Sequence, residues 1–422
     1  MSVRLFHPMV APHIQQVART LQEAGQLDRY VTTVVDRPDS TGQRLLCRAA
    51  RTIGVDLARE LSRRRLTEVP LSSVESHPWG EAFRVAFARA TRRDMRWHDG
   101  LWDILEKRFD HRVARGLHGR LTGVYGFLYS SLFTFQRARS LGVRIAYDLP
   151  SLEVEYVENL LREETTRFPE LDTPLRRWVL ARTPVRSARR RAEFQLADVV
   201  FANSHLTKTS YAAAGLDVSK VRVLHLGAPP CIDRDVAMSR NPQAPLTLLW
   251  AGGFSIIKGA HYVLEAWRRG QLGRFASLHV YGSVGIPERV LQPLPEGIHL
   301  HGSIPRTELL EKMTQADALL FPSLCDGFGM VATEAWSRGL PVLTTNRAGA
   351  ADLLRDGENG RLLAAADATA IIEQIHWCVA NRVALHAMRE AALATAARWQ
   401  WSDYRRALTR HLHEAGLFGP RE

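Results

Sequence analysis

The chain has 422 residues, 45% of them hydrophobic, which exceeds one ordinary core and fits two domains of about 200 residues each. No apolar stretch approaches the roughly 20 residues of a membrane span, and the opening MSVRLFHPMV is typical of a strand rather than of a secretory signal. The net charge is +12, and the four cysteines show neither metal-ligand nor disulfide-framework spacing, so we expect a folded, cytoplasmic protein that binds no metal.

All but five of the 56 basic residues are arginine, which either codon usage or an anionic partner would explain. Seven arginines and no acid lie between Arg176 and Arg191, and shorter clusters lie at 63–65 and 92–93. Such clusters favour peripheral contact with an anionic membrane through the first half of the chain. No zinc finger, RNA-binding signature or groove-reading element accompanies them, so we expect no nucleic-acid partner.

The first half of the chain predicts strands and helices in loose alternation. Strands are expected at 3–7, 31–35, 123–125, 143–147, 198–202 and 221–226, helices at 13–24 and 131–141, and mainly helical stretches at 45–118 and 153–195.

The second half alternates more strictly. Strands are expected at 246–251, 277–281, 298–301, 318–321 and 341–345, and helices at 260–269, 307–315 and 330–338. Strict alternation predicts an α/β fold with doubly wound parallel sheets, whose ligands bind at the carboxyl ends of the strands. We therefore expect one domain over 1–228, a Pro-rich linker over 229–245, a second domain over 246–400 and an amphipathic helix within 401–422.

Residues 322–341, PSLCDGFGMVATEAWSRGLP, combine a strand end, a glycine loop and a helix start near Gly329. The first amides of a helix are unpaired and lie at its positive end, so they can hold an anion. Gly327 and Gly329 would let a ligand approach the backbone closely.

Two acids, Asp326 and Glu334, flank this helix start. If a diphosphate lies on the amides of 327–331, a ribose lies further along the helix, where one carboxylate at Glu334 can accept two hydroxyl hydrogen bonds. A sugar on the other side lies within reach of Asp326. Alone, such a pair is usually a turn-stabilising Asp and a surface Glu; the surrounding glycines and strand favour a nucleotide-sugar site.

A second glycine loop follows the strand at 246–251 and reaches a helix through Gly253 and Lys258. A cation at a helix N-terminus opposes the helix dipole, and a diphosphate bound between them would relieve the conflict. The alternative is a solvated lysine.

These residues resemble glycosyltransferase family 4, a group of retaining transferases with the GT-B fold. The family's E-G-F-G-x4-E-A pattern corresponds to residues 326–335, and its lysine–glycine pair to Lys258-Gly259. Its G-G-x-P-E and D-G-x-N-G loops correspond to 348–352 and 356–360, and its A-D-x-v-x-a-N-S strand to 197–204. The resemblance is strong over roughly 195–405.

The resemblance implies two Rossmann-like domains facing across a cleft, the first binding an acceptor and the second a nucleotide-sugar donor. It implies that Glu334 holds the ribose, that Asp326 contacts the donor sugar and that Lys258 stabilises the departing diphosphate. Further donor contacts fall on the loop of Gly253, on Ile304 near the base, and on the amides of Phe328, Gly329, Met330 and Val331. It also implies retention without a metal or cofactor, and a C-terminal helix that crosses back to the first domain.

The chain departs from the family at three places. Asp326 stands where the family usually has Glu, and Gly253 where it often has Arg. In the first loop, Ala11-Pro12-His13 replaces a glycine pair, and His13 is the candidate for the family's histidine beside the sugar.

The sequence therefore predicts a retaining transferase that uses a UDP- or GDP-sugar and acts on a lipid-linked or cell-envelope saccharide. A soluble aglycone as acceptor and a non-catalytic, sugar-nucleotide-binding scaffold remain alternatives. The D-x-D spacing at Asp233–Asp235 lies in the predicted linker, and we interpret it as chance. The pairs His299/His301 and His411/His413 lack a third ligand in the sequence pattern, so no metal site is predicted from them.

Overall fold

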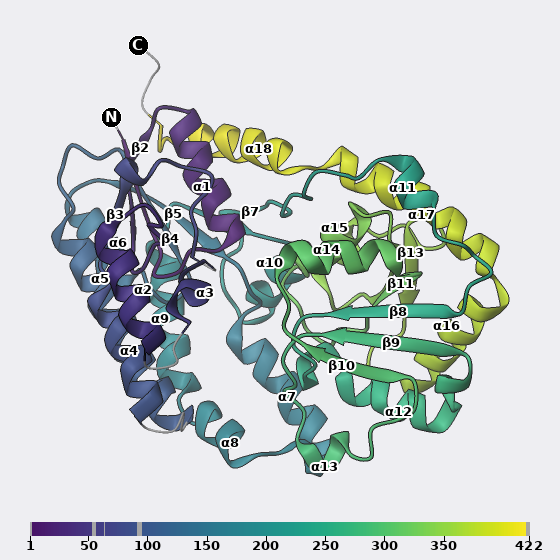
Figure 1. Ribbon diagram of the computed structural model, residues 1–422. Coiled ribbons are helices and arrows are strands. Elements are labelled where there is room, and N and C mark those ends of the chain that lie inside the picture. The colour runs from purple at the N-terminus through teal and green to yellow at the C-terminus, as the bar shows by residue number, and fades with distance from the viewer. Residues whose placement is uncertain (1, 53–55, 63, 91–94, 419–422) are drawn as a thin grey trace.

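The computed structural model describes residues 2–52, 56–62, 64–90 and 95–418, and it contains two parallel sheets joined side by side (Figure 1). The first sheet has the order β3-β2-β1-β4-β5-β6-β7. Its strands are β1 (Val3–Phe6), β2 (Leu27–Thr32), β3 (Val74–Ser76), β4 (Gly123–Phe127), β5 (Arg144–Leu149), β6 (Val199–Ala202) and β7 (Val221–Val223). The second sheet has the order β10-β9-β8-β11-β12-β13. Its strands are β8 (Leu246–Ala251), β9 (Ala276–Tyr281), β10 (Ile298–Gly302), β11 (Ala318–Phe321), β12 (Val342–Thr345) and β13 (Gly360–Leu363). Both sheets are doubly wound, which confirms the predicted fold class.

The helices of the first half fill the connections between strands. They are α1 (Pro12–Glu23), α2 (Thr41–Thr52), α3 (Leu57–Ser62), α4 (Trp79–Ala90), α5 (Met95–Arg115), α6 (Leu132–Ser140), α7 (Val154–Arg167), α8 (Pro174–Leu180), α9 (Thr183–Leu196) and α10 (His205–Ala213), with short 3₁₀ turns η1 (Leu71–Ser73) and η2 (Pro169–Leu171). The stretch predicted as mainly helical over 153–195 is helical, but it is divided into α7, η2, α8 and α9, with Pro169, Pro174 and Pro184 in the first turns of the last three.

The helices of the second half run closer to the predicted bounds. They are α11 (Arg234–Met238), α12 (Ala260–Gly270), α13 (Glu288–Leu291), α14 (Arg306–Gln315), α15 (Met330–Trp336), α16 (Ala368–Ala380), α17 (Arg382–Arg398) and α18 (Trp401–Glu414), with 3₁₀ turns η3 (Ile256–Lys258), η4 (Leu272–Arg274) and η5 (Gly349–Leu353). Two edge strands, β3 and β13, were not predicted, because their sequences VES and GRLL lack the apolar run that identified the other strands.

The segment that contains α7 and η2 leaves the first sheet and packs on the second. It lies between β5 and β6 in sequence, yet Leu160 and Leu171 belong to the hydrophobic core around β8 and α12. The Glu164 carboxylate accepts hydrogen bonds from His261 Nε2 and the Tyr262 hydroxyl of α12, both at 2.9 Å. Figure 1 shows α7 beside the second sheet, with α8 leading back to the first.

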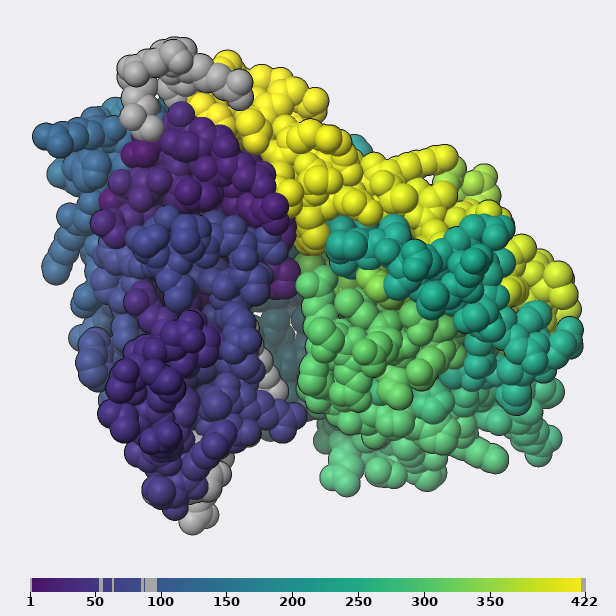
Figure 2. All heavy atoms as spheres, turned by 45° about the horizontal axis from the view of Figure 1, so that its top comes forward, coloured from purple at the N-terminus to yellow at the C-terminus, as the bar shows by residue number. Residues whose placement is uncertain are grey.

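The C-terminal segment crosses in the opposite direction. Helix α17 packs on α15, the chain turns at Trp399 and Gln400, and α18 then lies along α1. At the turn, a Cβ on Gly227 would meet Trp401 N at 2.6 Å, so two crossing chains touch backbone to backbone. Figure 2 shows this segment in yellow across the top of both halves, with a hollow between the halves below it.

Candidate functional site

The loop between β11 and α15 is anchored against the loop after β12. Asp326 N donates to Arg347 O at 3.0 Å, Gly349 N to Asp326 O at 2.9 Å, and Ala350 N to Phe328 O at 2.6 Å. Gly329 has φ +82°, and a Cβ there would lie 2.5 Å from the Phe321 ring. Only glycine fits this position without strain, so the loop enters α15 in one fixed conformation.

Lys258 and Asp326 form an ion pair across this loop. Lys258 ends the turn η3, and its Nζ lies 5.4 Å from the centroid of the Phe321 ring. The other oxygen of Asp326 accepts from Phe328 N at 3.2 Å, so that amide already has a partner. The sequence predicted separate contacts for Lys258 and Asp326 along a donor, and the structure places them in direct contact.

Glu334 lies on the buried side of α15 and pairs with Arg306, whose Nε donates to its carboxylate at 2.7 Å. Burial raises the pKa of Glu334, and Arg306 opposes that rise. We did not predict Arg306 as a site residue. The signal was present, because Arg306 is a cation at the start of α14, the same conflict with a helix dipole that identified Lys258.

The remaining predicted donor residues lie at the same edge of the second sheet. Gly253 follows β8, and a Cβ there would make only an ordinary contact with Ser283 Oγ at 3.7 Å. Ile304 follows β10 and is half-buried, as are Met330 and Val331 at the start of α15. Carboxyl ends of parallel strands are where ligands bind in doubly wound sheets, so these residues are well placed for one common ligand.

Gly327 contacts the first half of the chain. Its carbonyl accepts from Ser204 Oγ at 2.5 Å and from Thr207 Oγ1 at 3.1 Å. A Cβ on Gly327 would lie 2.9 Å from Pro150 O. We predicted that this glycine would admit a ligand; in the structure its close neighbour is the backbone after β5.

One group among the described residues has the spacing of metal ligands, and it joins the two halves of the chain. The Asp352 carboxylate accepts from the backbone N of His205 at 2.7 Å and from His225 Nε2 at 2.9 Å, and His205 Nδ1 lies 3.1 Å away. All three contacts converge on one oxygen, so hydrogen bonding by itself accounts for the cluster. Burial raises the pKa of Asp352, but these hydrogen bonds outweigh it and hold the pKa below its ordinary value.

His13 lies at the start of α1, where its ring meets the edge of Phe127 at 5.7 Å. Its Nε2 is buried without a hydrogen-bond partner among the described residues. Burial and the nearby His7 lower the pKa of His13 to about 3, so the ring is neutral. The His7 ring lies 5.0 Å from the same Phe127 ring, and burial lowers the pKa of His7 to about 4.

Most of the arginines between Arg176 and Arg191 have acidic partners, so they are not a free basic surface, and the membrane contact expected from them stays a prediction. Six of the seven form ion pairs, with the acids Asp99, Asp103, Asp110, Glu155, Asp172 and Glu193. The seventh, Arg190, stacks over Tyr129. In the shorter clusters, Arg64 pairs with Glu81 and Arg65 with Asp36, while 63, 92 and 93 lie outside the described residues.

The second half of the chain shows the clearest sequence similarity to known proteins. Residues 245–381 match a family model described as "Glycosyl transferases group 1". "D-inositol 3-phosphate glycosyltransferase 1" of Catenulispora acidiphila is 30% identical over 190 residues, which are 40% of this chain and 45% of that protein. An "Uncharacterized 41.2 kDa protein in cps region" of Klebsiella pneumoniae is 26% identical over 183 residues, 42% of this chain and 50% of that one. The chain spans about half the length of these curated relatives.

Solved structures match along nearly the whole chain. Anabaena Alr3699/HepE in complex with UDP and glucose aligns with a TM-score of 0.63 at 14% identity, covering 98% of this chain and 99% of that one. Sucrose-phosphate synthase from Thermosynechococcus elongatus aligns with a TM-score of 0.65 at 15% identity, covering 98% of each chain. The fold is therefore the GT-B fold of glycosyltransferases.

Proposed function

We propose that this GT-B protein is a retaining glycosyltransferase that moves a sugar from a UDP- or GDP-sugar to a saccharide acceptor, without a metal or other cofactor. The observation that carries the proposal is the order of charged groups at one edge of the second sheet. Asp326 and Lys258 lie together at the loop, and Glu334 with Arg306 lies further along α15. Sugar, diphosphate and ribose follow one another in the same order in a nucleotide sugar.

Each of these groups has a defined task in the proposed reaction. The Glu334 carboxylate accepts hydrogen bonds from the ribose hydroxyls, and the Arg306 guanidinium opposes the rise in the pKa of Glu334 that burial causes. Lys258 and the amides of Gly329, Met330 and Val331 stabilise the negative charge that develops on the departing diphosphate. The Lys258–Asp326 ion pair has to open or be shared when the donor arrives, which then frees Asp326 for a sugar hydroxyl.

The comparisons support this proposal at two points. The family model matches the sheet that carries Lys258, Asp326 and Glu334. Two of the structural neighbours are complexes of Alr3699/HepE with UDP and with UDP-glucose, which supports a uridine nucleotide as the first donor to test. Retention rests on the resemblance of these motifs to glycosyltransferase family 4, and the anomeric configuration of the product, read by proton NMR, tests it.

Nucleotide binding provides the main test. Thermal unfolding is measured with UDP, GDP, ADP and their common sugars, and one of them is expected to stabilise the protein. A ligand at 100 times its dissociation constant adds about 2.7 kcal/mol to the free energy of unfolding. In Glu334→Gln the affinity for that nucleotide is expected to fall at least tenfold, because the ribose loses charge-assisted hydrogen bonds of about 1.5–3 kcal/mol.

A matched control is Glu308→Gln on the exposed side of α14, which is expected to keep the nucleotide affinity of the unmodified protein. Transfer is also expected to persist in EDTA. If no nucleotide stabilises the protein, or if Glu334→Gln binds as tightly as the unmodified chain, the donor site is placed wrongly.

A non-catalytic sugar-nucleotide-binding scaffold is the second candidate. It is favoured by the Lys258–Asp326 ion pair, which neutralises the cation that would face the diphosphate, and by Gly253, which supplies no second cation. Nucleotide binding without any sugar transfer or donor hydrolysis would select this candidate.

We also propose that the protein contacts an anionic membrane. The helix α2 favours this contact, whereas most arginines between Arg176 and Arg191 already have acidic partners. This helix has no buried residue and no acid, and it exposes Leu45 and Leu46 beside Arg44, Arg48 and Arg51. Apolar side chains flanked by arginines are typical of helices that lie in the interface of an anionic bilayer. No helix among the described residues is long and apolar enough to span a membrane.

Vesicle sedimentation tests this contact. The protein is expected to bind vesicles that contain phosphatidylglycerol more than pure phosphatidylcholine vesicles. Replacing Leu45 and Leu46 by Gln is expected to weaken this binding by about 100-fold or more, since two buried leucine side chains supply about 3 kcal/mol or more. Equal binding to both vesicle types would leave a soluble acceptor as the remaining version of the proposal.

A further inference from the structure

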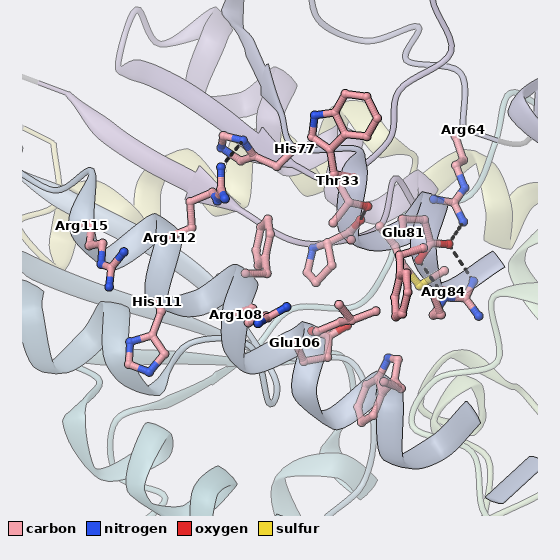
Figure 3. A pocket seen from close by; sticks show the side chains of 18 residues that line it. Thr33, Arg64, His77, Glu81, Arg84, Glu106, Arg108, His111, Arg112 and Arg115 are labelled. Carbon is pink, nitrogen blue, oxygen red and sulfur yellow. Dashed lines mark hydrogen bonds and ion pairs between the residues drawn. The ribbon is translucent and has the colours of Figure 1, made fainter. Parts of the chain in front are cut away.

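The first half of the chain contains a cavity of about 1080 Å³ at the carboxyl ends of β1, β2 and β3 (Figure 3). Met9, Thr33 and His77, each of which closely follows one of these strands, form one side. Helices α4 and α5 form the other side. None of the residues predicted for the donor lines it, so this cavity is a separate site in a doubly wound sheet, at the edge where ligands bind.

Three arginines of α5 line the cavity without a carboxylate partner among the residues that the structure describes. Arg108, Arg112 and Arg115 are spaced by four and three residues, which places them along one face of the helix. The polar contact recorded within this row joins Arg112 Nη1 to His77 Nδ1 at 3.5 Å, as Figure 3 shows. The row therefore presents positive charge that nothing in the described chain neutralises.

The other two arginines of the cavity show the contrast. Arg64 and Arg84 both bond Glu81, and Arg84 holds it with two hydrogen bonds, from Nε at 2.7 Å and from Nη2 at 2.6 Å. Their charge is balanced inside the protein. The charge available to a ligand thus lies at one end of the cavity, on α5.

An aromatic wall lines the rest of the cavity. Trp79 is 84% exposed and Phe83 57% exposed, so both rings present apolar surface that a ligand can cover. Trp102 and Phe109 complete the wall, and Trp102 is held in place by stacking on Tyr129 at 5.0 Å. Such a surface suits either the face of a sugar ring or a hydrocarbon chain.

The second glutamate that lines the cavity, Glu106, does not compete with an anion. Burial and the neighbouring Glu81 raise the pKa of Glu106 to about 8, so its carboxyl is largely protonated at neutral pH. The net charge of the side chains that line the cavity is therefore strongly positive.

We propose that this cavity binds the acceptor as a phosphate ester, with the phosphate on Arg108, Arg112 and Arg115 and the organic part on the aromatic wall. That the bound phosphate ester is the acceptor rests on the proposed transferase function. The binding of a phosphate ester in this cavity does not depend on that function. The cavity is linked to His13 through the end of β1, because Met9 N donates to His7 Nδ1 at 2.9 Å and the rings of His7 and His13 both contact Phe127. An acceptor seated here extends toward the unpaired Nε2 of His13.

Binding is measured on the full chain by isothermal titration calorimetry, with excess UDP present to occupy the donor site. Farnesyl phosphate is compared with farnesol, and glucose 1-phosphate with glucose, so that the lipid and soluble sources of the same chemistry are separated. At least one phosphate ester is expected to bind about tenfold or more tightly than its unphosphorylated match. The affinity is expected to fall with added salt.

The double variant Arg112→Gln/Arg115→Gln is expected to lose most of this preference for the phosphate. Its control, Arg120→Gln, removes an exposed arginine outside the cavity and is expected to keep the preference. Both variants change surface side chains, and their unchanged thermal unfolding shows that they fold. A preference that is absent in the unmodified chain, or retained in the double variant, overturns the proposal.

The outcomes separate this proposal from the one on function. Phosphate-ester binding that depends on the arginine row, in a protein that never transfers a sugar, supports the cavity and removes the transferase. Sugar transfer that is unaffected by the double variant, with no phosphate-ester preference, keeps the transferase and removes the cavity as its acceptor site.

Discussion

Replacing Lys258 by Ala is expected to lower kcat for sugar transfer by roughly 10²–10³-fold, because one preorganised charge at a developing anion contributes that much to the rate. The charge on the diphosphate grows as its bond to the sugar breaks, so the lysine acts more on the transition state than on the bound donor. Lys258 is the one predicted cation near that position, since Gly253 carries no side chain. Steady-state kinetics with the donor found by thermal unfolding provide the measurement.

Lys312→Ala on α14 is the matched control and is expected to change kcat by less than about threefold, as a surface charge does. Asp326→Asn, which leaves Lys258 without its ion-pair partner, separates the role of the cation from that of the pair. A Lys258→Ala enzyme with nearly full kcat would mean that the amides and Arg306 suffice for the diphosphate. The assignment of Lys258 would then be withdrawn.

Gly349→Ala is expected to destabilise the protein by about 1–3 kcal/mol, the usual cost of extra volume in a close-packed site. The added Cβ would lie 2.1 Å from Gly327 O and 2.5 Å from Ser204 Oγ. The first of these is backbone and cannot rotate away, so the loop at 326–328 has to move. Movement of about 1 Å at a reacting centre can cost 10²-fold in rate, so transfer should fall along with the melting temperature.

Gly100→Ala provides the control for this substitution. Gly100 lies within α5, and a Cβ there would meet nothing within 4 Å. Its replacement is expected to be neutral or slightly stabilising, since alanine favours a helix over glycine. If Gly349→Ala unfolds at the same temperature and keeps its activity, the contact between Gly327 and Ser204 is not a fixed part of the working protein.

The fold and the loop between β11 and α15 could be predicted from the sequence, because both follow from local sequence patterns. The predicted donor residues 326–331 and Glu334 lie within one short stretch, so strand, glycine loop and helix follow from local pattern, and the structure has them as β11, a loop and α15. Lys258 could be added because it opposed a helix dipole. Whether these residues bind a donor stays a prediction.

The first half could not be predicted as far, because its features join residues that are distant in the sequence. Arg186 and Arg189 are paired with Asp103 and Asp110, about 80 positions away, and a run of arginines gives no sign of such partners. The cavity likewise combines the ends of three strands with two helices. Interdomain contacts such as that of Gly327 with Ser204 depend on how the two sheets meet, which no local pattern encodes.

The crossing segments limit how this protein can be recombined with its relatives. Helix α7 comes from the first half but completes the core of the second, and α18 comes from the end of the chain but covers α1. In a chimera joined only at the linker, Leu160 and Leu171 would therefore pack against the second half of another protein. Helix α1 would be covered by the C-terminal helix of that other protein. Breakpoints that exchange one acceptor half for another have to fall at four places: on either side of α7–η2, in the linker, and before α18, since Leu417 after α18 also packs in the core of the first half.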